Sequence, residues 1–95
     1  MIKAYDKEIL TEDLKSPEQF YIFFRSKGCR PCKEIEPDLL KFSDNYDKLI
    51  YIIEENEAED LQKLWGVNFY PTVIVSQENK IQYKAEGIFK IKELL

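Results

Sequence analysis

The fold of this chain is decided by one stretch of its sequence, Phe20-Tyr21-Ile22-Phe23-Phe24-Arg25-Ser26-Lys27-Gly28-Cys29-Arg30-Pro31-Cys32-Lys33. Its first five residues are apolar and mostly aromatic, which is typical of a strand buried on both faces in the middle of a sheet. A turn follows, and two cysteines separated by two residues then stand directly before a helical pattern. A Cys-x-x-Cys pair between a strand and a helix is typical of a redox-active dithiol.

Three further segments predict strands. Residues 49–53 and 72–75 are short apolar runs, which favour buried strands. In residues 80–86 apolar and polar side chains alternate, and this pattern favours a half-exposed strand near the edge of the sheet.

Between these strands the apolar residues recur every three or four positions, which is the period of a helix. The first apolar stripe, which predicts a helix of about a dozen residues, consists of Ile35, Leu39, Phe42 and Tyr46. The second stripe, which predicts a shorter helix that ends at Gly66, consists of Ala58, Leu61, Leu64 and Trp65. We expect about two helical turns in residues 89–95, and a short helix that begins at residues 11–14 and ends at Pro17. Interior packing is predicted for Trp65, Tyr46, Tyr51 and Tyr83.

The predicted order of elements is strand, helix, strand, helix, strand, helix, strand, strand, helix. This order describes an α/β fold in which a central mixed β-sheet carries helices on both faces. The chain has 95 residues and shows no internal repeat and no linker-like stretch. We therefore expect residues 1–95 to form a single domain.

Charge and hydropathy exclude several classes of partner. The 14 Lys and Arg against 18 Asp and Glu give a net charge of −4, which argues against nucleic acid and anionic membranes. No apolar run approaches the roughly 18 residues of a membrane span, and residues 1–7 lack the features of a secretory signal. We expect a cytoplasmic monomer, with the acidic residues between 54 and 60 in a solvated loop and helix start.

The chain has no histidine and only two cysteines, which narrows its chemistry. A Ser-His-Asp triad, a Cys-His pair, a histidine-bearing metal site and a four-thiolate zinc site within one chain are all excluded. No cofactor and no metal are expected, because a dithiol itself carries two electrons. Two other interpretations of Cys29 and Cys32 stay open: half of a zinc site shared between two chains, and a pair of inert buried thiols.

The predicted helix start at the cysteine pair favours a reactive thiolate. Cys29 would face the free backbone N–H groups and the positive end of the helix dipole, and both favour thiolate over thiol. Three cations add positive charge nearby: Lys27, Arg30 and Lys33. Pro31 suits the first helical turn, where a missing N–H costs little. Cys29 would attack a target disulfide, and Cys32, one turn inside the helix, would release the resulting mixed disulfide.

The sequence resembles the thioredoxin superfamily over nearly its whole length. The resemblance rests on residues 29–33 and on three later marks in register: Pro37 inside the predicted helix, Tyr70-Pro71-Thr72 before a strand, and Gly87 after the edge strand. It implies a thioredoxin fold and a thiol–disulfide oxidoreductase that acts on protein disulfides, receives electrons from an upstream disulfide reductase and serves cell redox homeostasis. It also implies a cis Pro71 beside the cysteines, with the backbone of Tyr70 binding an extended substrate segment like a neighbouring strand.

Several positions depart from the pattern of this family. Gly28 stands where typical thioredoxins have tryptophan, and Phe23 stands where they have a buried aspartate that is thought to exchange protons with the second cysteine. Water, Lys27 or Lys33 are the sequence's candidates for that exchange with Cys32. The last helix is about two turns shorter than in a full-length thioredoxin.

The dipeptide Arg30-Pro31 also differs from the commonest thioredoxin dipeptide, glycine-proline. A cation between the cysteines should stabilise the reduced form, which predicts a somewhat more oxidising couple. Two rivals to the reductase are a glutaredoxin-like enzyme recycled by glutathione and a non-catalytic binding module with a thioredoxin fold. About twenty residues before the catalytic strand favour thioredoxin over glutaredoxin. Retention of both cysteines argues against a pure binding module.

Overall fold

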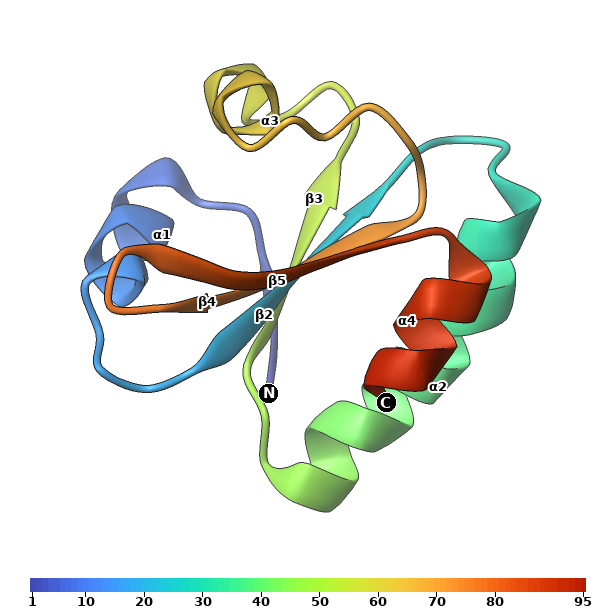
Figure 1. The fold of residues 1–95 in the computed structure, drawn as a ribbon, viewed down its shortest axis with the longest axis horizontal. Helices are drawn as coiled ribbons and strands as arrows, with labels where there is room; N and C mark the ends of the chain where they lie inside the picture. Colours follow the sequence, from blue (N-terminus) through green and yellow to red (C-terminus); the bar gives the residue numbers. More distant parts are fainter.

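The computed structural model describes residues 1–95 and contains five strands and four helices in the predicted order (Figure 1). The elements are β1 (Ile2–Ala4), α1 (Lys7–Leu14), β2 (Phe20–Arg25), α2 (Arg30–Tyr46), β3 (Ile50–Glu54), α3 (Glu59–Leu64), β4 (Thr72–Gln77), β5 (Lys80–Glu86) and α4 (Ile88–Leu94). The α/β fold with a mixed sheet and a short last helix is thereby confirmed. No helix combines the length and the apolar character that a membrane crossing requires.

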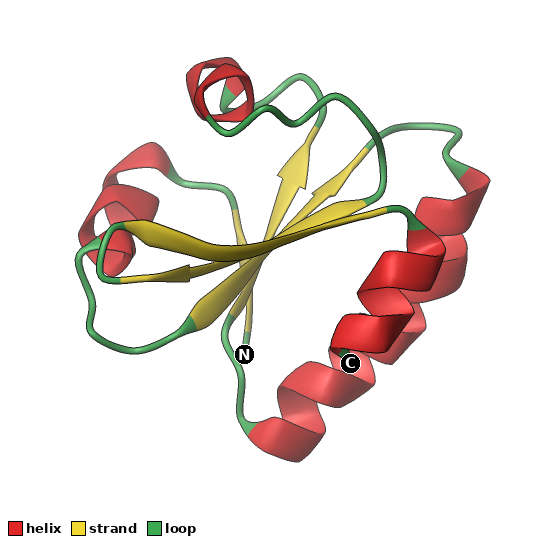
Figure 2. Cartoon of the chain, in the orientation of Figure 1, coloured by secondary structure: helices red, strands yellow, loops and turns green.

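The strands form one mixed sheet in the order β1-β3-β2-β4-β5 (Figure 2). Strands β1 and β2 both pair with β3 in parallel, whereas β4 runs antiparallel to β2 and to β5. Strand β2 is central, and residues 20–24 are buried on both of its faces, as their apolar run predicts. Phe23 lies opposite Ile52 of β3 and Val73 of β4.

Helices cover both faces of the sheet and bury two apolar clusters. Helices α2 and α4 lie together on one face, and α1 and α3 lie on the other (Figure 1). The first cluster includes Phe23, Cys32, Ile35 and Ile91, and Cys29 packs against it. The second includes Phe24, Leu10 and Tyr51, with Trp65 packed against it as predicted.

Helix α1 begins earlier than the sequence predicted, at Lys7 instead of residues 11–14. The side chain of Asp6 caps it, accepting hydrogen bonds from the N–H groups of Glu8 at 3.0 Å and Ile9 at 3.1 Å. The predicted start, Thr11, lies inside the helix and donates its hydroxyl hydrogen bond to the carbonyl of Lys7. The helix-capping side chain of Asp6 is thus the sequence feature that marks the start of α1.

Three side chains that the periodic patterns placed in the interior are exposed instead. Tyr46 and Leu64 are the last residues of α2 and α3, and they are 63% and 75% exposed. Tyr83 lies on the edge strand β5, where a register irregularity at Val75/Ser76 interrupts the pairing with β4. Helix α2 has 17 residues instead of about a dozen, since the cysteine turn is its first turn.

Candidate functional site

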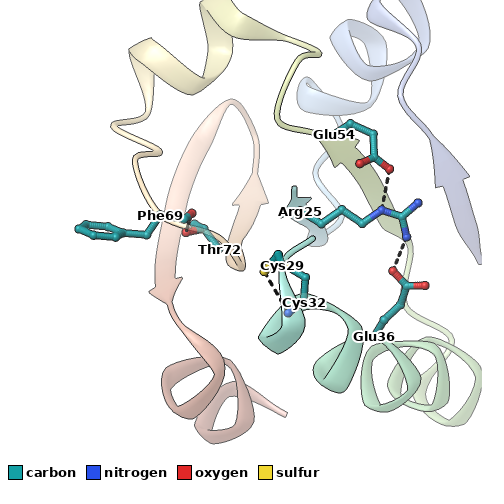
Figure 3. Close-up of a disulfide and its surroundings, with 7 residues drawn as sticks. All are labelled: Arg25, Cys29, Cys32, Glu36, Glu54, Phe69 and Thr72. Carbon is teal, nitrogen blue, oxygen red and sulfur yellow. Dashed lines mark hydrogen bonds and ion pairs between the residues drawn. A yellow bond between two sulfur atoms is a disulfide. The ribbon is translucent and has the colours of Figure 1, made fainter. Parts of the chain in front are cut away.

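The two cysteines are joined by a disulfide at the N-terminus of α2 (Figure 3). Cys29 is the N-cap residue of α2, and its Sγ accepts a hydrogen bond from the backbone N–H of Cys32 at 3.2 Å. Their Cα atoms are 5.3 Å apart, a separation that a disulfide spans without backbone movement. Pro31 occupies the first turn of the helix, where its missing N–H breaks no helical bond.

The two sulfur-bearing residues differ in exposure. Cys29 is partly exposed, whereas Cys32 is only 2% exposed and belongs to the apolar cluster under α2. A disulfide or thiol arriving from solvent therefore meets Cys29 first. This asymmetry fits the predicted division between an attacking and a resolving cysteine.

Gly28 gives the turn before the cysteines its backbone conformation. Its φ is +72°, in the region that favours glycine, and no atom lies within 4 Å of where a Cβ would stand. Space is thus available for a side chain, but the backbone geometry disfavours one. The glycine at this position is explained by the turn itself.

Gly28→Ala is expected to lower the free energy of unfolding by about 1 kcal/mol, because an L-residue in the left-handed region is strained. Urea unfolding of the oxidised protein measures this loss. Lys27→Ala, at the neighbouring exposed position with an ordinary φ, is the control and should stay within about 0.5 kcal/mol of the parent. Equal stabilities of the two variants would show that the turn is not strained.

The loop before β4 packs beside the disulfide. The Tyr70–Pro71 peptide bond is cis, as the resemblance implied. The carbonyl of Pro71 accepts a hydrogen bond from the N–H of Gly87 at 2.9 Å, and Thr72 Oγ1 donates to the carbonyl of Phe69 at 2.7 Å. Tyr70 packs against the same apolar cluster as Cys29.

A buried glutamine ties this loop to the loop between β3 and α3. The hydroxyl of Tyr70 donates to Gln62 Oε1, and Gln62 Nε2 donates to the carbonyls of Glu55 at 3.0 Å and Glu57 at 2.7 Å. Burial, with a smaller effect from Glu55, raises the pKa of Tyr70, so its hydroxyl remains a donor. No sequence pattern singles out Gln62, because a lone glutamine in a short helix is ordinarily exposed.

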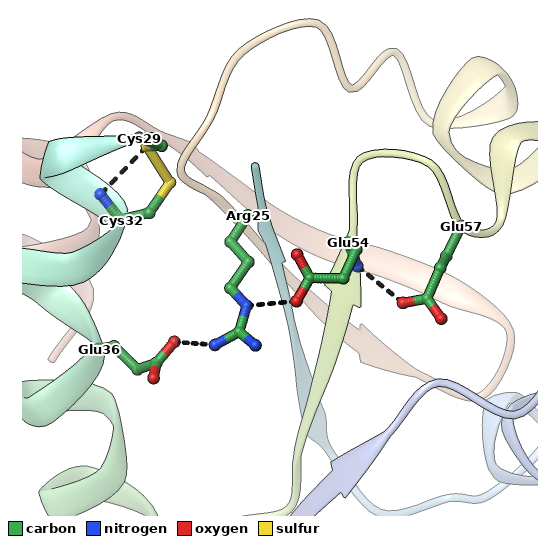
Figure 4. Close-up of polar contacts among 6 residues, drawn as sticks. All are labelled: Arg25, Cys29, Cys32, Glu36, Glu54 and Glu57. Carbon is green, nitrogen blue, oxygen red and sulfur yellow. Dashed lines mark hydrogen bonds and ion pairs between the residues drawn. A yellow bond between two sulfur atoms is a disulfide. The ribbon is translucent and has the colours of Figure 1, made fainter. Parts of the chain in front are cut away.

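Arg25 ends β2 and lies between two carboxylates (Figure 4). Its Nε donates to Glu54 Oε1 at 2.6 Å, and its Nη1 donates to Glu36 Oε1. Burial acts to lower the pKa of Arg25, but the hydrogen bonds to Glu54 and Glu36 outweigh it and raise that pKa. Glu54 was predicted to be a solvated member of the acidic run; it is half-buried instead.

The side chains of Arg25, Glu36 and Glu54 border a cavity of about 420 Å³ that Cys32 also lines.

The family model for thioredoxin matches residues 2–95 of the sequence. The chain belongs to the thioredoxin family. Its fold agrees: a thioredoxin from Nicotiana alata superposes with a TM-score of 0.85 at 21% identity, over 98% of this chain and 86% of that one.

Two curated relatives show how far the likeness extends in sequence. A thioredoxin H-type protein of Populus jackii is 29% identical over 68 residues, which cover 70% of this chain and 49% of the relative. DnaJ homolog subfamily C member 10 of Rattus norvegicus is 29% identical over 91 residues, covering 86% of this chain and 12% of the relative. The chain thus spans about half of the first relative and a small part of the second.

Within the thioredoxin family this chain departs at the position of the buried aspartate. Phe23 stands there, fully buried in the cluster that contains Cys32. The cavity beside Cys32 is lined by three charged groups that no sequence pattern assigned to the site, Arg25, Glu36 and Glu54. One signal was available, because Glu36 follows Cys32 by four residues and so shares its helical face.

The predicted tuning residues Arg30, Pro31 and Lys33 lie in the first turn of α2, which also carries the disulfide. The side chain of Arg30 is 91% exposed, and its Nε lies 3.7 Å from Glu34 Oε1. Lys27 and Lys33 line the same cavity as Cys32. No group of three acidic, cysteine or histidine side chains converges as a metal site requires.

Proposed function

We propose that this protein is a thiol–disulfide oxidoreductase that reduces disulfides in extended protein segments. The proposal is carried by the unequal exposure of the two bonded cysteines: Cys29 is partly open to solvent and Cys32 is buried. In such a pair the more exposed sulfur of Cys29 can attack an incoming disulfide, and the buried sulfur of Cys32 can then resolve the mixed disulfide. Membership of the thioredoxin family supports the same chemistry.

The proposed cycle moves two electrons in two exchanges. The Cys29 thiolate attacks one sulfur of a substrate disulfide, so a mixed disulfide forms and the other substrate sulfur leaves as a thiolate. Cys32 then loses its proton and attacks Cys29 Sγ. The Cys29–Cys32 disulfide forms, and the second substrate sulfur leaves as a thiolate. Both substrate thiolates take up protons, and an upstream disulfide reductase returns two electrons to the protein.

Three features favour the thiolate of Cys29 that this cycle needs. The N–H of Cys32 already points at Cys29 Sγ at 3.2 Å, and a thiolate accepts such a bond more strongly than a disulfide sulfur. Cys29 also caps a helix of 17 residues, so the positive end of the helix dipole faces its sulfur. Arg30, at 91% exposure, adds a weaker and solvent-screened attraction.

The main chain of Tyr70 is the proposed docking point for substrate. Neither its N–H nor its carbonyl forms a hydrogen bond within the chain, although both lie in the loop that packs beside the disulfide. Free main-chain groups of this kind pair with an extended peptide in the manner of an added strand. Pro71, buried directly after Tyr70, fixes the course of the chain there.

The cellular setting is part of the proposal. We assign the activity to a monomer in the cytoplasm, where a reducing glutathione pool keeps such a dithiol ready to donate electrons. Protein disulfides are the proposed substrates. The net charge of −4 supports neither nucleic acid nor an anionic membrane as a partner.

The reduction potential of the Cys29–Cys32 couple tests the proposal. We expect a single two-electron transition between about −270 and −230 mV, in the range of reductants of the thioredoxin type. Thiol trapping of protein equilibrated in graded redox buffers measures it. Arg30→Gly is the companion variant, and its potential should shift by less than about 30 mV because the Arg30 charge is solvent-exposed.

The titration and a kinetic assay with glutathione as the only reductant separate the rival functions. A transition far above −200 mV, near the potentials of disulfide-forming oxidants, would replace the reductase by an oxidant or isomerase. Reduction by glutathione alone at a catalytic rate would favour the glutaredoxin-like enzyme. Failure to form an intramolecular disulfide would leave a binding module.

A further inference from the structure

The buried cysteine meets solvent through a charged cavity. Cys32 lines this cavity of about 420 Å³, whereas Cys29 does not. The volume is ample for several waters, and the lining supplies polar partners to hold them. A proton that leaves the thiol of Cys32 therefore enters a space bordered by charged side chains.

Only two of those charged groups are able to accept a proton. Arg25, Lys27 and Lys33 line the cavity as cations, and a guanidinium or an ammonium carries donors but no acceptor. The acceptors are the carboxylates of Glu36 and Glu54. The cations contribute instead by stabilising a thiolate on Cys32.

Geometry favours Glu36 over Glu54. Glu36 lies one helical turn after Cys32 on α2, so the two side chains share a face of the same rigid helix. Glu54 comes from β3 and lies on the other side of the Arg25 guanidinium (Figure 4). Arg25 donates hydrogen bonds to both carboxylates. It therefore holds Glu36 at the cavity, while Glu36 shares the positive charge of Arg25 with Glu54.

We propose that Glu36 accepts the proton of Cys32 when the mixed disulfide is resolved, with Arg25 as the residue that positions it. The inference rests on the proposed function. The Cys32 thiol passes its proton through cavity water to the Glu36 carboxylate, and Cys32 Sγ attacks Cys29 Sγ. The Cys29–Cys32 bond forms, the bond from Cys29 to the substrate breaks, and the departing thiolate takes a proton from Glu36 or from water.

The remaining titratable groups near Cys32 stay neutral. Tyr21 and Tyr70 pack into or against its apolar cluster, and burial raises the pKa of both phenols. The hydroxyl of Tyr70 is also engaged as a donor to Gln62. Between pH 5 and 8 the charges that face Cys32 are therefore those of the cavity.

Proton transfer to Glu36 leaves a signature in the pH profile of resolution. Moving the proton from the thiol of Cys32 to the carboxylate of Glu36 leaves the total number of protons on the two residues unchanged. The state before the transfer and the state after it therefore hold one proton each. Their ratio is independent of pH, so the resolution rate levels off on the acid side. Without the carboxylate, the rate follows the free thiolate and falls tenfold for each pH unit below the pKa of the thiol.

The test mixes reduced protein with an equimolar amount of dithiobis(nitrobenzoate), whose released thiolate is coloured. The first phase of release reports attack by Cys29, and the second reports resolution by Cys32. Between pH 5 and 8, Glu36→Gln should lose the acid plateau and resolve at least about tenfold more slowly near pH 6. Glutamine retains an oxygen that accepts from Arg25, so the cavity keeps its shape.

Two controls remove the same charge elsewhere. Asp38→Asn alters an exposed carboxylate on the same helix, and Glu54→Gln alters the second carboxylate of the cavity. Both should keep the plateau. A plateau that survives in Glu36→Gln, that vanishes in Glu54→Gln, or that is missing from the parent protein overturns the assignment.

The inference and the proposed function fail in different ways. If the parent protein releases no second thiolate, resolution does not occur and the oxidoreductase itself is overturned. If both phases appear but neither depends on Glu36, only the proton acceptor is overturned. If Glu36→Gln does not fold, the parent protein and Glu54→Gln still test the acceptor, because a plateau that is missing from the parent or that vanishes in Glu54→Gln overturns the assignment to Glu36.

Discussion

Serine at position 32 is expected to trap the protein on its substrate, whereas serine at position 29 is expected to abolish reaction altogether. Cys29 is the partly exposed sulfur and Cys32 the buried one, so Cys32→Ser should still form a mixed disulfide but lack the thiol that releases it. Cys29→Ser should lower turnover roughly a thousandfold or more, because a hydroxyl neither attacks nor retains the disulfide. Reduction of a disulfide-bonded protein, followed on non-reducing gels, measures both effects.

The two variants are matched controls for each other, since each replaces one sulfur by oxygen in the same helical turn. Circular dichroism should show the same helix content for both, because neither side chain spans distant elements. Mixed disulfides accumulating on Cys29→Ser instead of Cys32→Ser would reverse the assigned roles. Turnover retained by Cys29→Ser would favour a binding module.

Phe23→Asp, which restores the aspartate typical of the family, should destabilise this chain by at least about 3 kcal/mol. Phe23 is fully buried, and its neighbours on the adjacent strands, Ile52 and Val73, are apolar. The change removes a large core side chain and buries a carboxyl group with no partner opposite it. Urea unfolding at several pH values measures the loss.

The pH dependence of this variant separates buried charge from lost packing. Burial raises the pKa of an unpaired carboxyl in the folded state above its unfolded value of about 3.9. The folded protein then holds more protons than the unfolded chain, so stability falls as pH rises from about 4 to the folded pKa. Phe23→Asn leaves the same space without a charge and should show no such slope. Equal slopes in both variants would mean that the introduced carboxylate finds solvent or a partner.

The parts of the site that follow local rules could be predicted from sequence. The cysteine pair, Pro31 and the helix start are neighbours in the chain, and their geometry depends on a single turn. The order of strands and helices along the chain followed from apolar runs separated by helical stripes. Tyr70 and Pro71 were placed beside the cysteines through the resemblance to a family, since no local pattern joins residues about forty positions apart.

The parts that were missed depend on side chains meeting across the fold. Arg25, Glu36 and Glu54 come from β2, α2 and β3, and each alone reads as an ordinary surface charge. The periodic pattern of apolar residues likewise identifies which face of a helix is apolar, but it does not show at which residue that face stops being buried. Tyr46 and Leu64 continue their stripes one step past the last packed turn and are therefore exposed.

The sheet also limits how this protein meets other copies of itself. One border strand, β1, has only three residues. The other, β5, alternates apolar with charged or polar side chains, and its pairing with β4 is irregular at Val75/Ser76 of β4. Short, charged and irregular borders resist the edge-to-edge stacking that leads to aggregates. The proposed docking of substrate at the main chain of Tyr70 uses neither border strand, because Tyr70 lies in the loop before β4.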